Sequence, residues 1–289
     1  MGGRSAPGSA SASDARALVR LARPANGLIA ACAVVVGAVV SRRPPDLAPA
    51  LVAALSAFAA TAGANALNDV LDRAADAVNR PGRPIPSGAV GVRPAVALAF
   101  AGYAAALGLA LALSAWAGAL AAAWVVLTAL YSVELKRVPL ASNALVAAVA
   151  ASPLLMGGIS QGRAGPTVVP LGLAFLAHLA REIAKDVEDV EGDAATGVRT
   201  IAVALGSKRA MGLSRIVMVA LMGAAVVPFA ARTFGWGYAA ALVVIDALLV
   251  LALVRTAGRA DREAAGRASL LLKCVMALGL LAFVLGVVW

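Results

Sequence analysis

Two groups of polar side chains, each at the end of a long apolar stretch, have the residue types and spacing of a divalent-cation site. The first acidic group is Asn65, Asp69, Asp72 and Asp76, and the second acidic group is Glu182, Asp186, Asp189 and Asp193. In both groups successive members are four, three and four residues apart, so each group would line one face of an α-helix. Hard oxygen ligands suit Mg²⁺, which commonly shares its coordination sphere with waters and substrate phosphates. Two such helices facing one another across a cavity would hold Mg²⁺ and a phosphate-bearing substrate between them.

The distribution of acidic residues argues against the alternative that the two groups are simply solvated helix ends. Nine of the 15 Asp and Glu residues of the chain fall within 69–76 and 182–193. Charges that serve only to solvate a surface are usually spread more evenly along a sequence. We therefore expect the clustering to serve a binding or catalytic site.

The composition of the chain is that of a membrane protein. Of its 289 residues, 62% are hydrophobic, and the mean hydropathy is +0.89, which is typical of the membrane class. Nine apolar stretches are long enough to cross a bilayer as helices. They lie near residues 24–41, 47–67, 93–113, 115–133, 140–160, 166–186, 210–231, 236–255 and 268–288. Because backbone in lipid must satisfy its own hydrogen bonds and these stretches do not alternate strictly, we predict an all-α polytopic membrane bundle of nine transmembrane helices.

Lysine and arginine are concentrated in alternate loops between the predicted spans. One set of loops, which includes the N-terminus and both acidic groups, carries 21 of the 25 Lys and Arg residues. The positive-inside rule then predicts that the N-terminus and an active-site cavity lie on the cytoplasmic side of the plasma membrane, with the C-terminus at Trp289 outside. Because topology explains the net charge of +10, we do not expect nucleic acid as a partner.

The sequence divides into a short tail and one membrane domain. Residues 1–13 are rich in Gly, Ser and Ala and have no apolar core, which predicts a disordered tail and not a cleaved signal peptide. We expect a single membrane domain over residues 14–289. Its two cysteines, Cys32 and Cys274, lie in separate spans without a CxxC motif or a His partner, so neither a disulfide nor a zinc site is expected.

A loop rich in proline and arginine follows the first acidic group. Three prolines and two glycines in residues 79–88 exclude a regular helix. Within this loop Arg80, Arg83 and Ser87 could bind phosphate oxygens, because guanidinium groups donate paired hydrogen bonds to phosphate. Cytoplasmic arginines also follow from topology alone, but a stiff loop beside a metal site favours the phosphate role.

Further polar residues near the predicted cytoplasmic ends of the spans are candidates for substrate binding. These are Arg23, Asn26, Tyr131, Lys136, Arg199 and Lys208. Asn26 could instead tie two helices together, and a terminal Tyr or Lys commonly anchors a helix at the interface. The single histidine, His178, has no second base nearby and is expected to be a helix-packing group. Asp246, alone in the eighth span, has no role that the sequence explains.

The first acidic group and the loop after it resemble the UbiA superfamily of intramembrane prenyltransferases. The resemblance lies in Asn-Asp-Val-Leu-Asp at 68–72 with Asp76, and in Arg-Pro-Ile-Pro-Ser-Gly at 83–88. It extends over nearly the whole chain, including a second Asp-rich motif at 186–193. Within the superfamily, residues 63–69 and 181–193 are most similar to the archaeal digeranylgeranylglyceryl phosphate synthases.

The resemblance implies an Mg²⁺-dependent prenyltransferase that takes an isoprenyl diphosphate as donor and works among membrane lipids. It implies that Asn68, Asp72, Asp186 and Asp189 are catalytic and hold the cation, with Asp69, Asp76 and Asp193 as supporting ligands. The implied acceptor is the lipid phosphate geranylgeranylglyceryl phosphate, whose phosphate could rest on Arg20, Arg23 and Lys136. Two alternatives remain open, namely an aromatic acceptor such as 4-hydroxybenzoate in quinone synthesis, and an ion-coupled secondary transporter.

Overall fold

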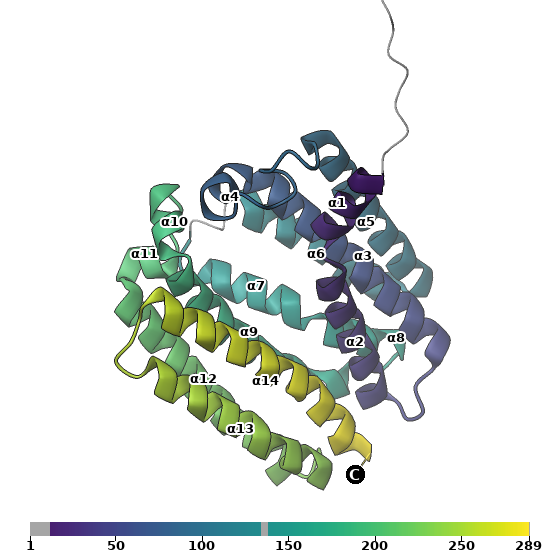
Figure 1. Cartoon of the computed structure of the whole chain (residues 1–289). Coiled ribbons are helices and arrows are strands. Elements are labelled where there is room, and N and C mark those ends of the chain that lie inside the picture. Colours follow the sequence, from purple (N-terminus) through teal and green to yellow (C-terminus); the bar gives the residue numbers. More distant parts are fainter. Residues whose placement is uncertain (1–11, 134–137, 289) are drawn as a thin grey trace, which may run out of the picture.

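A computed structural model describes residues 12–133 and 138–288 of the chain. These residues form a bundle of helices and contain no strand (Figure 1). The predicted tail at 1–13 therefore falls almost wholly outside the described residues, and the first helix, α1, begins at Ala12 and ends at Ala22.

Eight helical segments in the described ranges are long and apolar enough to cross a membrane. They are α2 (Pro24–Ser41), α3 (Leu47–Leu71), α5 (Val92–Leu113), α7 with α8 (Ala141–Ala151 and Pro153–Ser160), η2 with α9 (Gly165–Thr167 and Val168–Glu188), α12 (Ser207–Ala230), α13 (Trp236–Thr256) and α14 (Arg262–Val288). The predicted fourth span is also an apolar helix, α6 (Ala115–Val133), but only its part up to Tyr131 enters this comparison. The all-α membrane bundle is confirmed, and the count of nine crossings stays a prediction.

Prolines set two of the boundaries between helices. Arg23 has a left-handed backbone with φ of 50° and separates α1 from α2, and as the residue before a proline it is disfavoured in the right-handed helical region. Pro24 then takes the first position of α2, where its missing N–H costs no hydrogen bond. Pro153 divides the predicted fifth span into α7 and α8, which meet at Ser152.

The bundle has two halves, and each has its own apolar core. One core consists of buried side chains from α2, α3, α5, α6 and α8, and many of these side chains are alanines. The other core joins α9, α12, α13 and α14, and buried side chains of α2 and α8 also belong to it. Small side chains allow helix backbones to approach closely in a membrane. At the closest approach, between α2 and α8, a Cβ on Gly37 would collide with the carbonyl oxygen of Leu154, and one on Gly157 would collide with that of Val34.

Short helices cap one end of the bundle next to the two acidic groups. They are α4 (Arg73–Asn79), α10 (Val190–Ala195) and α11 (Ile201–Leu205). α4 continues from α3, α10 continues from α9, and the two short helices contact one another. The acidic groups of the two halves therefore lie at the same end of the bundle, while α14 ends at the opposite end (Figure 1).

Candidate active site

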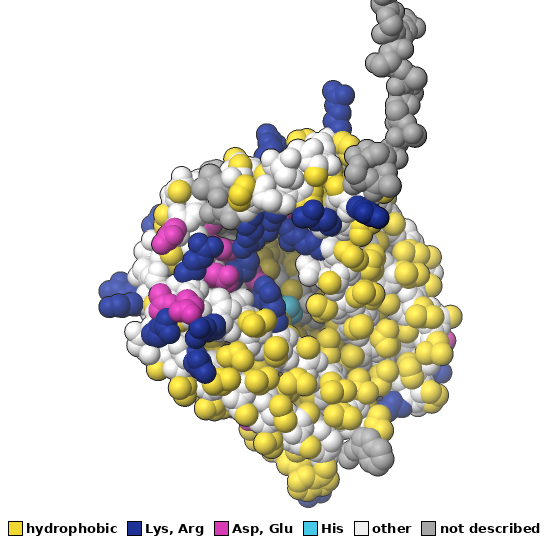
Figure 2. All heavy atoms as spheres, in the orientation of Figure 1, with side chains coloured by type: hydrophobic (Ala, Val, Ile, Leu, Met, Phe, Trp, Pro, Cys, Tyr) yellow, Lys and Arg dark blue, Asp and Glu magenta, His cyan; other side chains and the backbone are white. Residues whose placement is uncertain are grey.

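A large cavity lies between the two halves of the bundle. Its volume is about 990 Å³, and its lining changes from charged to apolar along its depth. Figure 2 shows the hollow on the surface, with Lys, Arg, Asp and Glu gathered above it, hydrophobic side chains below it, and the single histidine visible inside. Such a cavity can accept a molecule with an anionic head and a long apolar tail.

Two arginines neutralise the buried carboxylates of the first acidic group. Asp69 is 1% exposed and accepts hydrogen bonds from Arg23 and Arg83, the second with an Nη1–Oδ1 distance of 3.4 Å. Arg83 also donates to Asp76. Burial lowers the pKa of Arg23, although the charge of Asp69 opposes this shift, and an arginine keeps its proton at any physiological pH. The two arginines and two carboxylates thus form a network of fixed charges, as expected for buried ions that need partners.

The second acidic group is held by side chains from two other elements and by a lysine of α9 itself. The amide of Asn143, near the start of α7, donates to Oδ2 of Asp186 at 2.9 Å. Asp189 lies 3.2 Å from Nη2 of Arg80, beyond α4, and 3.7 Å from Nζ of Lys185. The Arg80–Asp189 pair therefore joins the loop after the first acidic group directly to the second acidic group.

The oxygen donors present fit Mg²⁺ only if substrate supplies part of the coordination. Among the described residues, no three Asp, Glu, His or Cys side chains converge closely enough to hold a metal ion on their own. Mg²⁺ is usually bound by one or two carboxylates, with waters and substrate phosphates in its other positions. Asn68 and Asp72 on one wall of the cavity, and Asp186, Asp189 and Asp193 on the other, provide donors of this kind.

Comparison with known proteins identifies the family. The sequence model of the UbiA prenyltransferase family matches residues 29–281. The chain belongs to the UbiA prenyltransferase family. It is therefore an enzyme that transfers prenyl groups, and the transporter alternative is set aside.

Similarity to individual UbiA family proteins extends over almost the full length of the chain. The digeranylgeranylglyceryl phosphate synthase of Methanopyrus kandleri is 41% identical over 269 residues, which cover 93% of this chain and 98% of the relative. A solved structure described as giving insights into digeranylgeranylglyceryl phosphate synthase in membranes superposes with a TM-score of 0.78 at 26% identity, covering 95% of this chain and 99% of that one. A UbiA homolog from Archaeoglobus fulgidus, bound to GPP and Mg²⁺, superposes with a TM-score of 0.66 at 19% identity. The match covers 92% of this chain and 99% of the homolog.

Most of the residues that the sequence suggested for this UbiA site line the one large cavity. These are Arg23, Asn26, Asn68, Asp69, Asp72, Asp76, Arg80, Arg83, Tyr131, Asp186, Asp189 and Asp193. The structure does not bring Ser87, Arg199 or Lys208 to the cavity lining, and the Ser87 hydroxyl bonds to the carbonyl of Pro84 within its own loop. Lys136 lies outside the described residues.

Several polar residues of the UbiA site are not among those that the sequence suggested. Asn143 holds Asp186, while Arg181, Lys185 and Lys273 also line the cavity. The sequence could have suggested Lys273, because a lysine within an apolar span is expected to face a cavity or a partner. No feature of the sequence marks Asn143, since an amide at a helix end is common and its partner on the neighbouring helix is seen only in the structure.

Proposed function

We propose that this enzyme transfers a geranylgeranyl group from its diphosphate to geranylgeranylglyceryl phosphate and thereby forms the precursor of an ether lipid. The observation that carries the proposal is one cavity that combines a carboxylate- and arginine-rich end with a long apolar interior. The full-length similarity to a relative named digeranylgeranylglyceryl phosphate synthase supports this choice of acceptor. The A. fulgidus homolog bound to GPP and Mg²⁺ supports a metal-bound diphosphate donor.

The residues around the charged end of the cavity have distinct roles in this proposal. Asn68 and Asp72 from the first half, with Asp186 and Asp189 from the second, would hold Mg²⁺, and Asp193 would support them. When bound, the metal would act as a Lewis acid that offsets the charge of the departing diphosphate. Asn143 keeps the carboxylate of Asp186 oriented through its 2.9 Å hydrogen bond.

The arginines of the charged end would bind and orient the diphosphate. Arg23 and Arg83 are positioned by Asp69 and Asp76, and Arg80 is positioned by Asp189. Fixed cations aimed at the place where negative charge develops need no reorganisation during the reaction. Below them, apolar side chains such as Ile29, Val149 and Leu173 would exclude water from the prenyl chain.

A comparison of acceptors tests the proposed reaction. The purified full-length protein is given geranylgeranyl diphosphate and Mg²⁺ with either geranylgeranylglyceryl phosphate or 4-hydroxybenzoate, and products are identified by mass spectrometry. We expect efficient formation of the doubly prenylated glyceryl phosphate and little prenylated 4-hydroxybenzoate. The reverse preference would disprove the proposed acceptor and leave the prenyltransferase assignment intact.

We also propose that the charged end of the cavity faces the cytoplasm, as the cation distribution predicts. Ser87 and Arg163 are exposed and belong to loops on opposite sides in this topology. Single cysteines at these positions, in a background with Cys32→Ala and Cys274→Ala, should react with a membrane-impermeant maleimide from opposite faces. In inverted vesicles only S87C should be labelled, and in right-side-out vesicles only R163C. Labelling of both from the same face would contradict the topology.

A further inference from the structure

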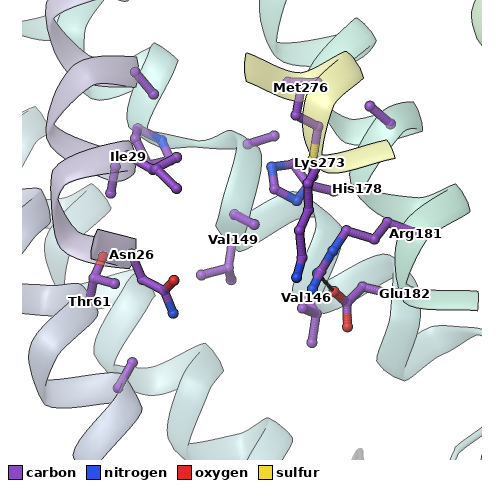
Figure 3. A pocket seen from close by; sticks show the side chains of 18 of the residues that line it. Asn26, Ile29, Thr61, Val146, Val149, His178, Arg181, Glu182, Lys273 and Met276 are labelled. Carbon is purple, nitrogen blue, oxygen red and sulfur yellow. Dashed lines mark hydrogen bonds and ion pairs between the residues drawn. The ribbon is translucent and has the colours of Figure 1, made fainter. Parts of the chain in front are cut away.

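A second set of nitrogen donors lies in the cavity below the acidic groups. His178 and Arg181 are on α9, Lys273 is on α14, and all three line the cavity. Figure 3 shows their side chains pointing into one space, across from Asn26 of α2 and from Thr61 of α3. None of these three residues has a role in the binding of the prenyl diphosphate as proposed above.

The described residues do not balance the charges of this set. Nη1 of Arg181 is paired with Oε1 of Glu182 at 2.5 Å, but Nε of Arg181 is buried and has no hydrogen-bond partner in the described parts of the chain. No carboxylate of the described residues forms an ion pair with the ammonium group of Lys273. With a neutral His178, the set and Glu182 carry one net positive charge. A buried donor without a partner is costly, and a bound anion would satisfy Nε of Arg181 while pairing with the ammonium group of Lys273, a residue that is itself exposed.

The lack of a carboxylate partner among the described residues distinguishes Lys273 from the arginines at the charged end. Arg23, Arg80 and Arg83 each contact a carboxylate, and so does Lys185. Helix anchoring by itself does not account for Lys273, because an anchoring lysine extends towards the membrane surface, whereas Lys273 points into the cavity. The position of Lys273 is therefore better explained by a ligand.

We propose that Lys273 and Arg181, assisted by His178, bind the phosphate monoester of the lipid acceptor. This inference rests on the proposed function, and it gives the acceptor's phosphate a site separate from that of the donor's diphosphate. Arg23, the candidate suggested by the sequence, is already paired with Asp69. No carboxylate of the described residues competes for Lys273 in this way.

The depth of this site suits the geometry of the reaction. Arg181 precedes Asp186 by five residues, which corresponds to about 7.5 Å along the axis of α9. In geranylgeranylglyceryl phosphate, the phosphate and the free hydroxyl are on neighbouring carbons. A phosphate at Arg181 and Lys273 would therefore direct that hydroxyl towards the acidic groups, where the allylic carbon of the donor leaves its diphosphate. Val146 and Met276 form apolar walls beside this space for the acceptor's chain (Figure 3).

Lys273→Met is the variant that tests the site, because it removes the charge, keeps the length of the side chain and leaves no protein carboxylate unpaired. We expect the KM for geranylgeranylglyceryl phosphate to rise roughly 10- to 100-fold, as for loss of a charge-assisted hydrogen bond. The KM for geranylgeranyl diphosphate and kcat should stay within about twofold, since the lost contact is to the acceptor only. Lys273→Arg should recover most of the acceptor affinity. Arg262→Met, on the same helix but outside the cavity, should behave as the unmodified protein.

Two further measurements make the outcome unambiguous. Geranylgeranylglycerol, which lacks the phosphate, should be a poor acceptor whose KM is the same with and without Lys273. In EDTA, where no turnover occurs, geranylgeranylglyceryl phosphate should raise the melting temperature of the unmodified protein more than that of Lys273→Met. The second measurement also shows that the variant is folded.

The results separate this inference from the proposed function. Failure of the unmodified protein to use geranylgeranylglyceryl phosphate would refute the proposed function. Good use of that acceptor, with an unchanged acceptor KM in Lys273→Met or an equal rise in both KM values, would refute the second anion site alone.

Discussion

Removal of divalent cations with EDTA is expected to abolish prenyl transfer completely, and added Mg²⁺ is expected to restore it. The physical reason is that the carboxylates of both acidic groups line the cavity that would receive the diphosphate. Without a cation between them, the carboxylates and the diphosphate would repel each other. This repulsion is strong where water is excluded. The measurement is the initial rate with geranylgeranyl diphosphate and geranylgeranylglyceryl phosphate, before and after chelation.

A melting curve in the same buffers serves as the control for this experiment. The described residues pair several of these carboxylates with arginine, lysine or asparagine, so the fold does not depend on the metal. The melting temperature of the protein should therefore hardly change in EDTA. Full turnover in excess chelator would refute a metal-bridged diphosphate.

Asp186→Asn and Asp72→Asn are each expected to lower kcat/KM by about 100-fold or more, since each removes a proposed metal ligand that carries charge. Asparagine keeps the shape of aspartate and can still accept the 2.9 Å hydrogen bond from Asn143 at position 186. The loss would therefore report the charge and not the packing. Steady-state kinetics at saturating Mg²⁺ measure the effect.

Glu263→Gln is the matched control for these two variants. Glu263 is an exposed carboxylate in the first turn of α14, and it does not line the cavity. Its neutralisation should leave kcat/KM within about twofold of the unmodified enzyme, because surface ion pairs contribute little. Near-normal rates in both Asp→Asn variants would locate the metal site elsewhere.

The local elements of this fold were predictable, because each depends on a short stretch of sequence. The start of α2 at Pro24 follows from the backbone restrictions of proline, and the spans follow from apolar runs of bilayer length. The spacing of four, three and four residues from Asn65 to Asp76, repeated from Glu182 to Asp193, indicated two helix faces that belong to one site. Both faces do line the same cavity.

The partners of these residues were not predictable in the same way. Arg23 and Asp69 are 46 residues apart, and Arg80 and Asp189 are 109 apart. Which loop meets which helix depends on how the two halves pack, and the hydropathy of a span does not encode its neighbours. Pro153 shows a related limit, because proline within a membrane helix can either kink it or divide it.

The Arg80–Asp189 contact has a consequence for the order in which ligands can load. A carboxylate suited to a metal ion and a guanidinium suited to a phosphate are each other's counter-ion, so binding is an exchange reaction. A cation that arrived alone would displace Arg80 and leave its charge without a partner, and a diphosphate that arrived alone would do the same to Asp189. A magnesium–diphosphate complex would satisfy both groups in one step, and we therefore expect that complex to be the form in which metal and diphosphate bind together.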